Sequence, residues 1–138
     1  MTQVDFFASL VNGQPLEPEG SRLAIAEWTA LGTALGDTPQ LIAPLHIHHN
    51  DDEAWYVLEG TLGFKVGDMI VEANANQAVV VPRGTPHTYW NPKPATARYI
   101  IIMTSQIRSL IDEIHATEQR NIETLKEIFR KYESELLE

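Results

Sequence analysis

Residues 44–60 read PLHIHHNDDEAWYVLEG and bring His46, His48 and Glu53 close together along the chain. The two histidines are two positions apart, so both side chains leave the same face of an extended strand. After a turn over residues 50–52, the alternation of Glu53 with Trp55 directs Glu53 back toward that face. Neutral imidazole suits a transition metal and a carboxylate adds a charged oxygen ligand, so this stretch predicts half of a metal site.

A second stretch, residues 76–91, reads NQAVVVPRGTPHTYWN and supplies one more histidine. Residues 79–81 are expected to form a short strand, and the prolines at positions 82 and 86 force a turn after it. His87 then opens the next strand, with Tyr89 on the same face. His87 is therefore a further candidate ligand.

Together the two stretches resemble the paired motifs of the cupin superfamily, which are His-x-His, four residues, Glu, six residues and Gly, then Pro-x-Gly-x-x-His-x-x-x-Asn. Gln40 and Asn76 stand where that family usually has glycine, which affects turn geometry and not metal binding. The resemblance covers residues 22–104, and the positions that match are His46, His48, Glu53, Gly60, Pro82, Gly84, His87 and Asn91.

The resemblance implies a mainly β fold, an antiparallel cupin-type, jelly-roll-like barrel over residues 22–104. An N-terminal arm is expected over residues 1–21 and a helical segment over residues 105–138. The resemblance also implies one divalent transition metal, which is iron, manganese, nickel, copper or zinc. The ligands that it implies are His46, His48, Glu53 and His87, and a site of three histidines would leave Glu53 as a nearby base.

Composition narrows the class of protein. The chain of 138 residues is long enough for one domain with its own core. It has no cysteine, so any metal must be held by nitrogen and oxygen. A net charge of −9 argues against a nucleic-acid partner. No apolar run approaches the ~20 residues that span a bilayer. The first ten residues also lack a basic region followed by a long apolar one, which is the pattern of a secretion signal. We therefore expect a soluble cytoplasmic protein without a membrane partner.

Short strands with turn chemistry between them predict the barrel. Residues 22–29 favour a strand, although their alanines leave a helix possible. Gly67 and Asp68 lie between two strands and suit a type II′ hairpin turn. Residues 97–104 form the last expected strand.

The period of the apolar residues changes after Thr104. From Ile107 to Leu136 they recur at spacings of three and four, as in amphipathic helices that pack on the barrel or on a dimer partner. The pattern leaves open whether there is one helix or two, and Asn121 is a candidate N-cap for a second. Residues 121–137 also resemble, weakly, the tail of small quercetin-dioxygenase-like cupins. We expect a homodimer.

Side chains near the candidate ligands suggest a substrate pocket. Trp55 and Tyr89 share the inward face and line a pocket or pack in the core, and Phe64 and Met103 are candidates for the same cavity. We expect a metal-dependent enzyme on a small organic substrate, dioxygenase-like on an enol or phenol, with Glu53 as catalytic base. The alternatives are a non-catalytic module that binds a small ligand or senses a metal, and a metal-dependent isomerase.

Overall fold

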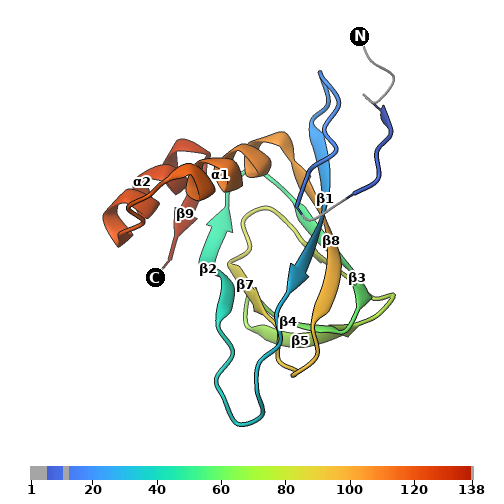
Figure 1. The fold of residues 1–138 in the computed structure, drawn as a ribbon. Coiled ribbons are helices and arrows are strands. Elements are labelled where there is room, and N and C mark those ends of the chain that lie inside the picture. The colour runs from blue at the N-terminus through green and yellow to red at the C-terminus, as the bar shows by residue number, and fades with distance from the viewer. Residues whose placement is uncertain (1–5, 11–12, 138) are drawn as a thin grey trace.

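The computed structural model describes residues 6–10 and 13–137, and over these residues the chain forms nine strands and two helices (Figure 1). The elements are β1 (Leu23–Ala30), β2 (Leu41–His48), β3 (Glu53–Glu59), β4 (Thr61–Val66), β5 (Met69–Asn74), β6 (Ala78–Val81), β7 (His87–Trp90), β8 (Ala97–Thr104), α1 (Ser105–Ala116), α2 (Ile122–Lys131) and β9 (Ser134–Leu136). None of the described helices is long and apolar enough to cross a membrane.

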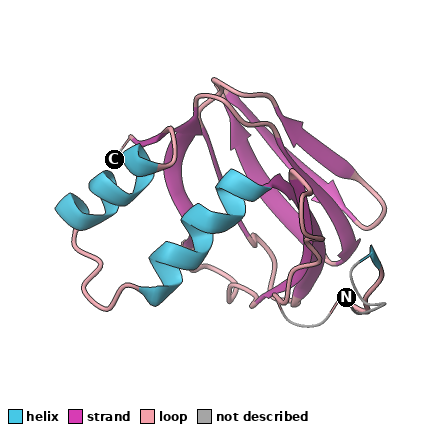
Figure 2. Ribbon diagram, turned by 90° about the horizontal axis from the view of Figure 1, so that it is seen from above, coloured by secondary structure: helices cyan, strands magenta, loops and turns pink. Residues whose placement is uncertain are grey.

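The strands form two antiparallel sheets. One has the order β1-β8-β3-β6 and the other the order β5-β4-β7-β2-β9. Seen from above, the two helices lie together at one side of the strands (Figure 2). This arrangement confirms the expected fold class, a mainly β, jelly-roll-like barrel with helices at the C-terminal end.

Alternation along the strands builds the core between the two sheets. In β3 the buried residues are Glu53, Trp55 and Val57, and in β8 every second residue from Ala97 to Met103 is buried. Residues 23–30, whose alanines left a helix possible, form a strand that pairs with β8 along its whole length. Pairing with a neighbouring strand therefore decides the conformation there.

Two turns show how local sequence sets the connections. Gly67 has φ +60 and lies with Asp68 between the paired residues Val66 and Met69, which confirms the type II′ hairpin. Asn76, where the related family usually has glycine, adopts φ +72, a conformation that asparagine tolerates better than most residues. Its backbone N–H donates to the Val57 carbonyl, so the turn keeps its place against β3.

The C-terminal segment contains two helices. Thr104 caps α1 by accepting a hydrogen bond from the Ile107 N–H, and Asn121 caps α2 through the Thr124 N–H, as expected for Asn121. The prediction of helices up to residue 138 is wrong at its end, because residues 134–136 form β9, which pairs with β2. The pairing supplies hydrogen-bond partners to the backbone at the edge of β2 and buries Leu136. These gains favour a strand here, although the apolar residues continue the helical spacing.

The expected N-terminal arm follows the edge of β1 where it is described. The Gly13 N–H donates to the Glu27 carbonyl, and Leu16 forms an antiparallel bridge with Ile25. Residues 1–5 and 11–12 of the expected arm, and Glu138 of the expected C-terminal segment, lie outside the described residues.

Candidate metal centre

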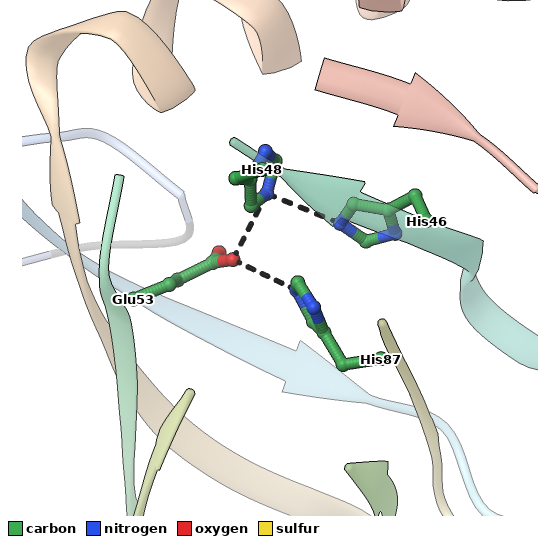
Figure 3. Close-up of side chains that lie close together, drawn as sticks. All are labelled: His46, His48, Glu53 and His87. Atoms are coloured by element: carbon green, nitrogen blue, oxygen red, sulfur yellow. Dashed lines mark hydrogen bonds and ion pairs between the residues drawn. The ribbon is translucent and has the colours of Figure 1, made fainter. Parts of the chain in front are cut away.

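The four candidate ligands come from both sheets and converge at one point. His46 and His48 point inward from β2, and His87 opens β7 in direct register with His46. Glu53 opens β3 in the facing sheet. All four side chains are buried, and one donor atom from each lies within 4.8 Å of the others (Figure 3). The structure therefore brings together the four residues that the two motifs indicated.

Hydrogen bonds on the outer side of the cluster fix the tautomer of each imidazole. Nδ1 of His46 lies 2.6 Å from the Pro44 carbonyl, and Nδ1 of His87 lies 2.9 Å from the Thr85 carbonyl. A carbonyl oxygen can only accept, so both Nδ1 atoms carry a proton. In a neutral imidazole the other nitrogen, Nε2, then presents a lone pair.

The third histidine is fixed by a side chain from the C-terminal strand. Nδ1 of His48 lies 2.7 Å from Oγ of Ser134, and this hydroxyl donates to the Tyr132 carbonyl at 3.2 Å. The hydroxyl proton is thereby used, so Ser134 accepts from His48 Nδ1–H. His48 Nε2 consequently also presents a lone pair toward the centre.

The inner side of the cluster consists of acceptors that face one another. Nε2 of His46 and Nε2 of His48 are 3.1 Å apart, and Oε1 of Glu53 lies 3.3 Å from Nε2 of both His48 and His87. Lone pairs at such distances repel unless a positive charge lies among them. The site thus offers three imidazole nitrogens and one carboxylate oxygen, a set that fits a divalent transition metal. An outer hydrogen bond orients each imidazole, and Glu53 is positioned as the first residue of β3.

Burial and mutual charge perturb the ionisation of the cluster. Burial, together with the neighbouring His87 and His48, lowers the pKa of His46 to about 3. Burial alone raises the pKa of Glu53, but the contacts of its carboxylate with His48 and His87 outweigh burial, and the net pKa is about 2. At neutral pH the site therefore offers a neutral His46 and an ionised Glu53, the forms that bind metals.

These two shifts predict that metal-free protein loses stability in acid. The folded pKa of His46, about 3, lies below its ordinary 6.5, so the unfolded chain binds more protons between these values. Glu53 acts with the same sign between 4.5 and about 2. We expect the urea midpoint of chelator-treated protein to fall steadily from pH 7 to pH 4. In a His46→Leu variant the urea midpoint should no longer change between about pH 6.5 and 4.5. A urea midpoint of the wild type that does not change with pH would contradict the lowered pKa values of His46 and Glu53.

Ser134 is a site residue that sequence reasoning missed. It lies far along the chain from His48, within a stretch that continues the helical period, so no spacing motif marks it. In the structure Glu133 adopts φ +57 and ends the helical run before Ser134, but a glutamate at that position gives no such signal in the sequence.

Removing the Ser134 hydroxyl is expected to weaken metal binding. Ser134→Ala leaves His48 Nδ1–H without its acceptor, and loss of an outer partner of a ligating histidine costs about 10- to 100-fold in affinity. Competition with a chromogenic chelator measures this change. Ser109→Ala, on an exposed position of α1, is the matched control. Equal affinities in the two variants would show that Ser134 does not orient His48.

A cavity of about 210 Å³ adjoins the cluster. It is lined by three of the candidate ligands, by Trp55 and Tyr89, and by apolar residues of α1 and α2; the three ligands are His46, His48 and Glu53. Phe64 and Met103 are buried in the core and do not line this cavity. Instead, Phe64 stacks behind Tyr89 with ring centroids 5.6 Å apart. A larger open hollow of about 720 Å³ along the β1–β2 loop contains none of the four ligands.

The two other histidines lie apart from the cluster. His49 faces outward as expected, and its Nε2 lies 3.4 Å from Glu135. His115 is exposed on α1, as expected, but it also lines the cavity and packs edge-on against Trp28 at 5.8 Å between ring centroids. Phe129 of α2 packs against the ring of His46 at 5.5 Å, so the helices cover the cluster on one side.

Comparison with known proteins identifies the family. The family model described as Cupin domain matches residues 38–103. The fungal protein named Oxidoreductase iacF, from Pestalotiopsis fici, is 30% identical over 109 residues, which is 72% of this chain and 50% of that protein. The chain thus spans about half the length of this curated relative.

Solved structures share the fold. A cupin protein from Bacteroides fragilis has a TM-score of 0.59 at 11% identity, over 75% of this chain and 86% of that chain. A putative sugar phosphate isomerase from Acidithiobacillus ferrooxidans has a TM-score of 0.52 at 19% identity, over 60% of this chain and 50% of that chain. At these identities the likeness concerns the fold.

Proposed function

Because this chain is a small cupin-domain protein with a buried cluster of three histidines and a glutamate, we propose that it is a metal-dependent oxidoreductase. In this proposal His46, His48, Glu53 and His87 hold one divalent transition metal, and the enzyme acts in a dioxygenase-like manner on an enol or phenol. The observation that carries the proposal is the convergence of three Nε2 lone pairs and a carboxylate oxygen beside an apolar cavity. The name of the fungal relative, an oxidoreductase, agrees with it.

The chain's own residues have distinct roles in this proposal. A metal held by His46, His48, Glu53 and His87 would supply Lewis-acid and oxygen chemistry beside the cavity. Glu53 pairs with His48 and His87 through Oε1, and no described residue makes a hydrogen bond or ion pair with Oε2. Oε2 of the ionised Glu53 therefore accepts the proton of the substrate hydroxyl. The helices α1 and α2 supply apolar side chains to the wall of the cavity beside Glu53.

A second candidate is a non-catalytic module that binds a small ligand or senses a metal. Apart from the cluster itself, the ionisable residues that line the cavity are Tyr89, Tyr99 and His115, so the cavity offers no serine or cysteine nucleophile. A metal-dependent isomerase of phosphorylated sugars, suggested by the name of a structural neighbour, is disfavoured because no lysine or arginine lines the cavity.

Oxygen consumption separates these functions. Protein loaded in turn with iron(II), manganese, nickel, copper or zinc is mixed with a flavonol, a 1,3-diketone or a catechol in an oxygen-electrode cell. The proposal expects oxygen uptake with at least one redox-active metal and none with the His48→Ala variant. Thermal stabilisation by these compounds without oxygen uptake would instead support the binding module.

The homodimer and the cytoplasmic location are also proposals. The apolar stripe of the helices, which suggested the homodimer, is largely used within the chain, where Leu110, Ile128, Phe129 and Leu136 form one buried cluster. The β1–β2 loop instead exposes Leu31 and Leu35, at 83% and 88% of their full areas. Light scattering on the wild type and on a Leu31→Ser/Leu35→Ser variant tests whether these side chains join two copies.

A further inference from the structure

The inner wall of the cavity carries polar groups that the metal cluster does not use. Trp55 is 1% exposed, and its indole Nε1–H has no hydrogen-bond acceptor among the described residues. Tyr89 and Tyr99 are also buried, and their hydroxyl oxygens lie 3.0 Å apart. All three residues line the cavity beside the cluster. A buried N–H without a partner is costly, which suggests that an acceptor belongs there.

Counting donors shows what these groups can bind. The contact between Tyr89 and Tyr99 uses one hydroxyl proton, and the described residues provide no acceptor for the other. The ordinary pKa of a tyrosine hydroxyl is about 10, so both hydroxyls keep their protons at neutral pH. One O–H and the indole N–H are therefore free to donate to a ligand.

Packing holds these donors in place. The ring of Trp55 lies 5.3 Å from the rings of Phe64 and Tyr89 and 5.8 Å from that of His87, and the ring of Phe64 stacks on that of Tyr89. The indole Nε1–H of Trp55 makes no hydrogen bond within the described residues, and the Trp55 ring packs directly against that of Tyr89. The donors thus converge in a rigid aromatic wall next to His87.

The size and charge of the cavity limit the ligand further. An apolar cavity of ~150 Å³ holds benzene, and pockets for drug-sized ligands span roughly 300–1,000 Å³. The cavity here measures about 210 Å³, which suits one ring with small substituents. Its opposite wall is formed by Ile107, Leu110, Ile111 and Ile114 of α1, and no lysine or arginine lines it.

We propose that Trp55, Tyr89 and Tyr99 form an oxygen-binding subsite that selects a single-ring phenol or a small enol and rejects phosphorylated compounds. The inference rests on the proposed function, because it names the substrate class of the same site. One oxygen of the ligand accepts from the wall donors, and the ring packs between that wall and α1. A three-ring flavonol is larger than this cavity of about 210 Å³.

Ligand binding to zinc-loaded protein tests the subsite, since zinc has no redox chemistry and turnover is not needed. Titration calorimetry compares catechol, toluene, quercetin and glucose 6-phosphate on the wild type, Tyr89→Phe, Tyr99→Phe and Trp55→Phe. Each substitution is expected to weaken catechol binding about 2- to 10-fold while leaving toluene unchanged, because only catechol offers an oxygen. Tyr56→Phe, on the outward face of β3, is the matched control.

Three results would overturn the subsite. They are an equal loss for catechol and toluene, the same loss in Tyr56→Phe, or glucose 6-phosphate or quercetin binding as tightly as catechol. Circular dichroism and melting curves show whether each variant is folded, and the toluene titration shows whether its cavity is intact. Selective catechol binding without oxygen uptake would leave the subsite standing and overturn the enzyme. Oxygen uptake with unaltered binding in all three cavity variants would overturn the subsite alone.

Discussion

Replacing His48 or His87 by alanine is expected to remove the bound metal from purified protein. Each residue supplies one of four convergent donors, and the loss of a direct ligand should exceed the about 10- to 100-fold effect of losing an outer partner. Elemental analysis of protein purified without a histidine tag measures metal per chain. We expect a stoichiometric metal in the wild type and little in either variant.

The neighbouring His49 provides the control for this experiment. It adjoins His48 in sequence but is 48% exposed and lies beside Glu135, so His49→Ala should keep its metal. A loss of metal in His49→Ala equal to that in His48→Ala would indicate a general effect on folding or non-specific binding. A wild type that takes up no iron, manganese, nickel, copper or zinc would contradict the metal site and leave the protein as a binding barrel.

The candidate site was predictable from the sequence because its ligands lie in two compact motifs on strands. The two-residue period placed His46 and His48 on one face, and it placed Glu53 with Trp55 on the inward face of the next strand. Strand pairing then brought His87 into register with His46. Where alternation on a buried strand fixes a side chain, the sequence pattern is sufficient.

Other parts of the site depend on contacts that alternation does not specify. Alternation gives the face of the sheet but not the depth along it, so Phe64 and Met103, which were predicted to line the cavity, lie in the buried core and not in the cavity wall. Ser134 reaches His48 only because a three-residue strand pairs with the edge of β2. Three residues are too few to show the alternation of apolar and polar residues that predicts a strand, whereas the preceding residues show a clear helical spacing.

The helices also had a role that their sequence did not reveal. Their amphipathic period predicted an apolar face but not what it covers. In the structure α1 forms one wall of the cavity, and Phe129 of α2 packs against the His46 ring. The C-terminal segment therefore both encloses the cavity and, through Ser134, orients a candidate ligand.

Replacing Glu53 by glutamine is expected to reduce turnover about 10²- to 10⁴-fold, the usual contribution of a general base. Glutamine keeps an oxygen beside His48 and His87, but its amide cannot accept the substrate proton at neutral pH. The Glu53 pKa of about 2 means that this carboxylate is ionised before substrate arrives, so it acts as base and not as acid. Glu59→Gln, at the exposed end of the same strand, is the control.

Proton release provides a readout of Glu53 that does not depend on turnover. A catechol anion bound beside Glu53 places a second negative charge there and raises the pKa of the carboxyl from about 2. If that pKa rises above 7, the wild type retains the displaced proton on Oε2 of Glu53, whereas Glu53→Gln releases about one proton to the buffer. Calorimetry in buffers of different ionisation enthalpy measures this number, and elemental analysis confirms that the variant still holds metal. Equal proton release by the two proteins would show that another group, or water, takes the proton. Glu53 would then be a metal ligand alone, and the low pKa that His48 and His87 give it would serve metal binding and not proton transfer.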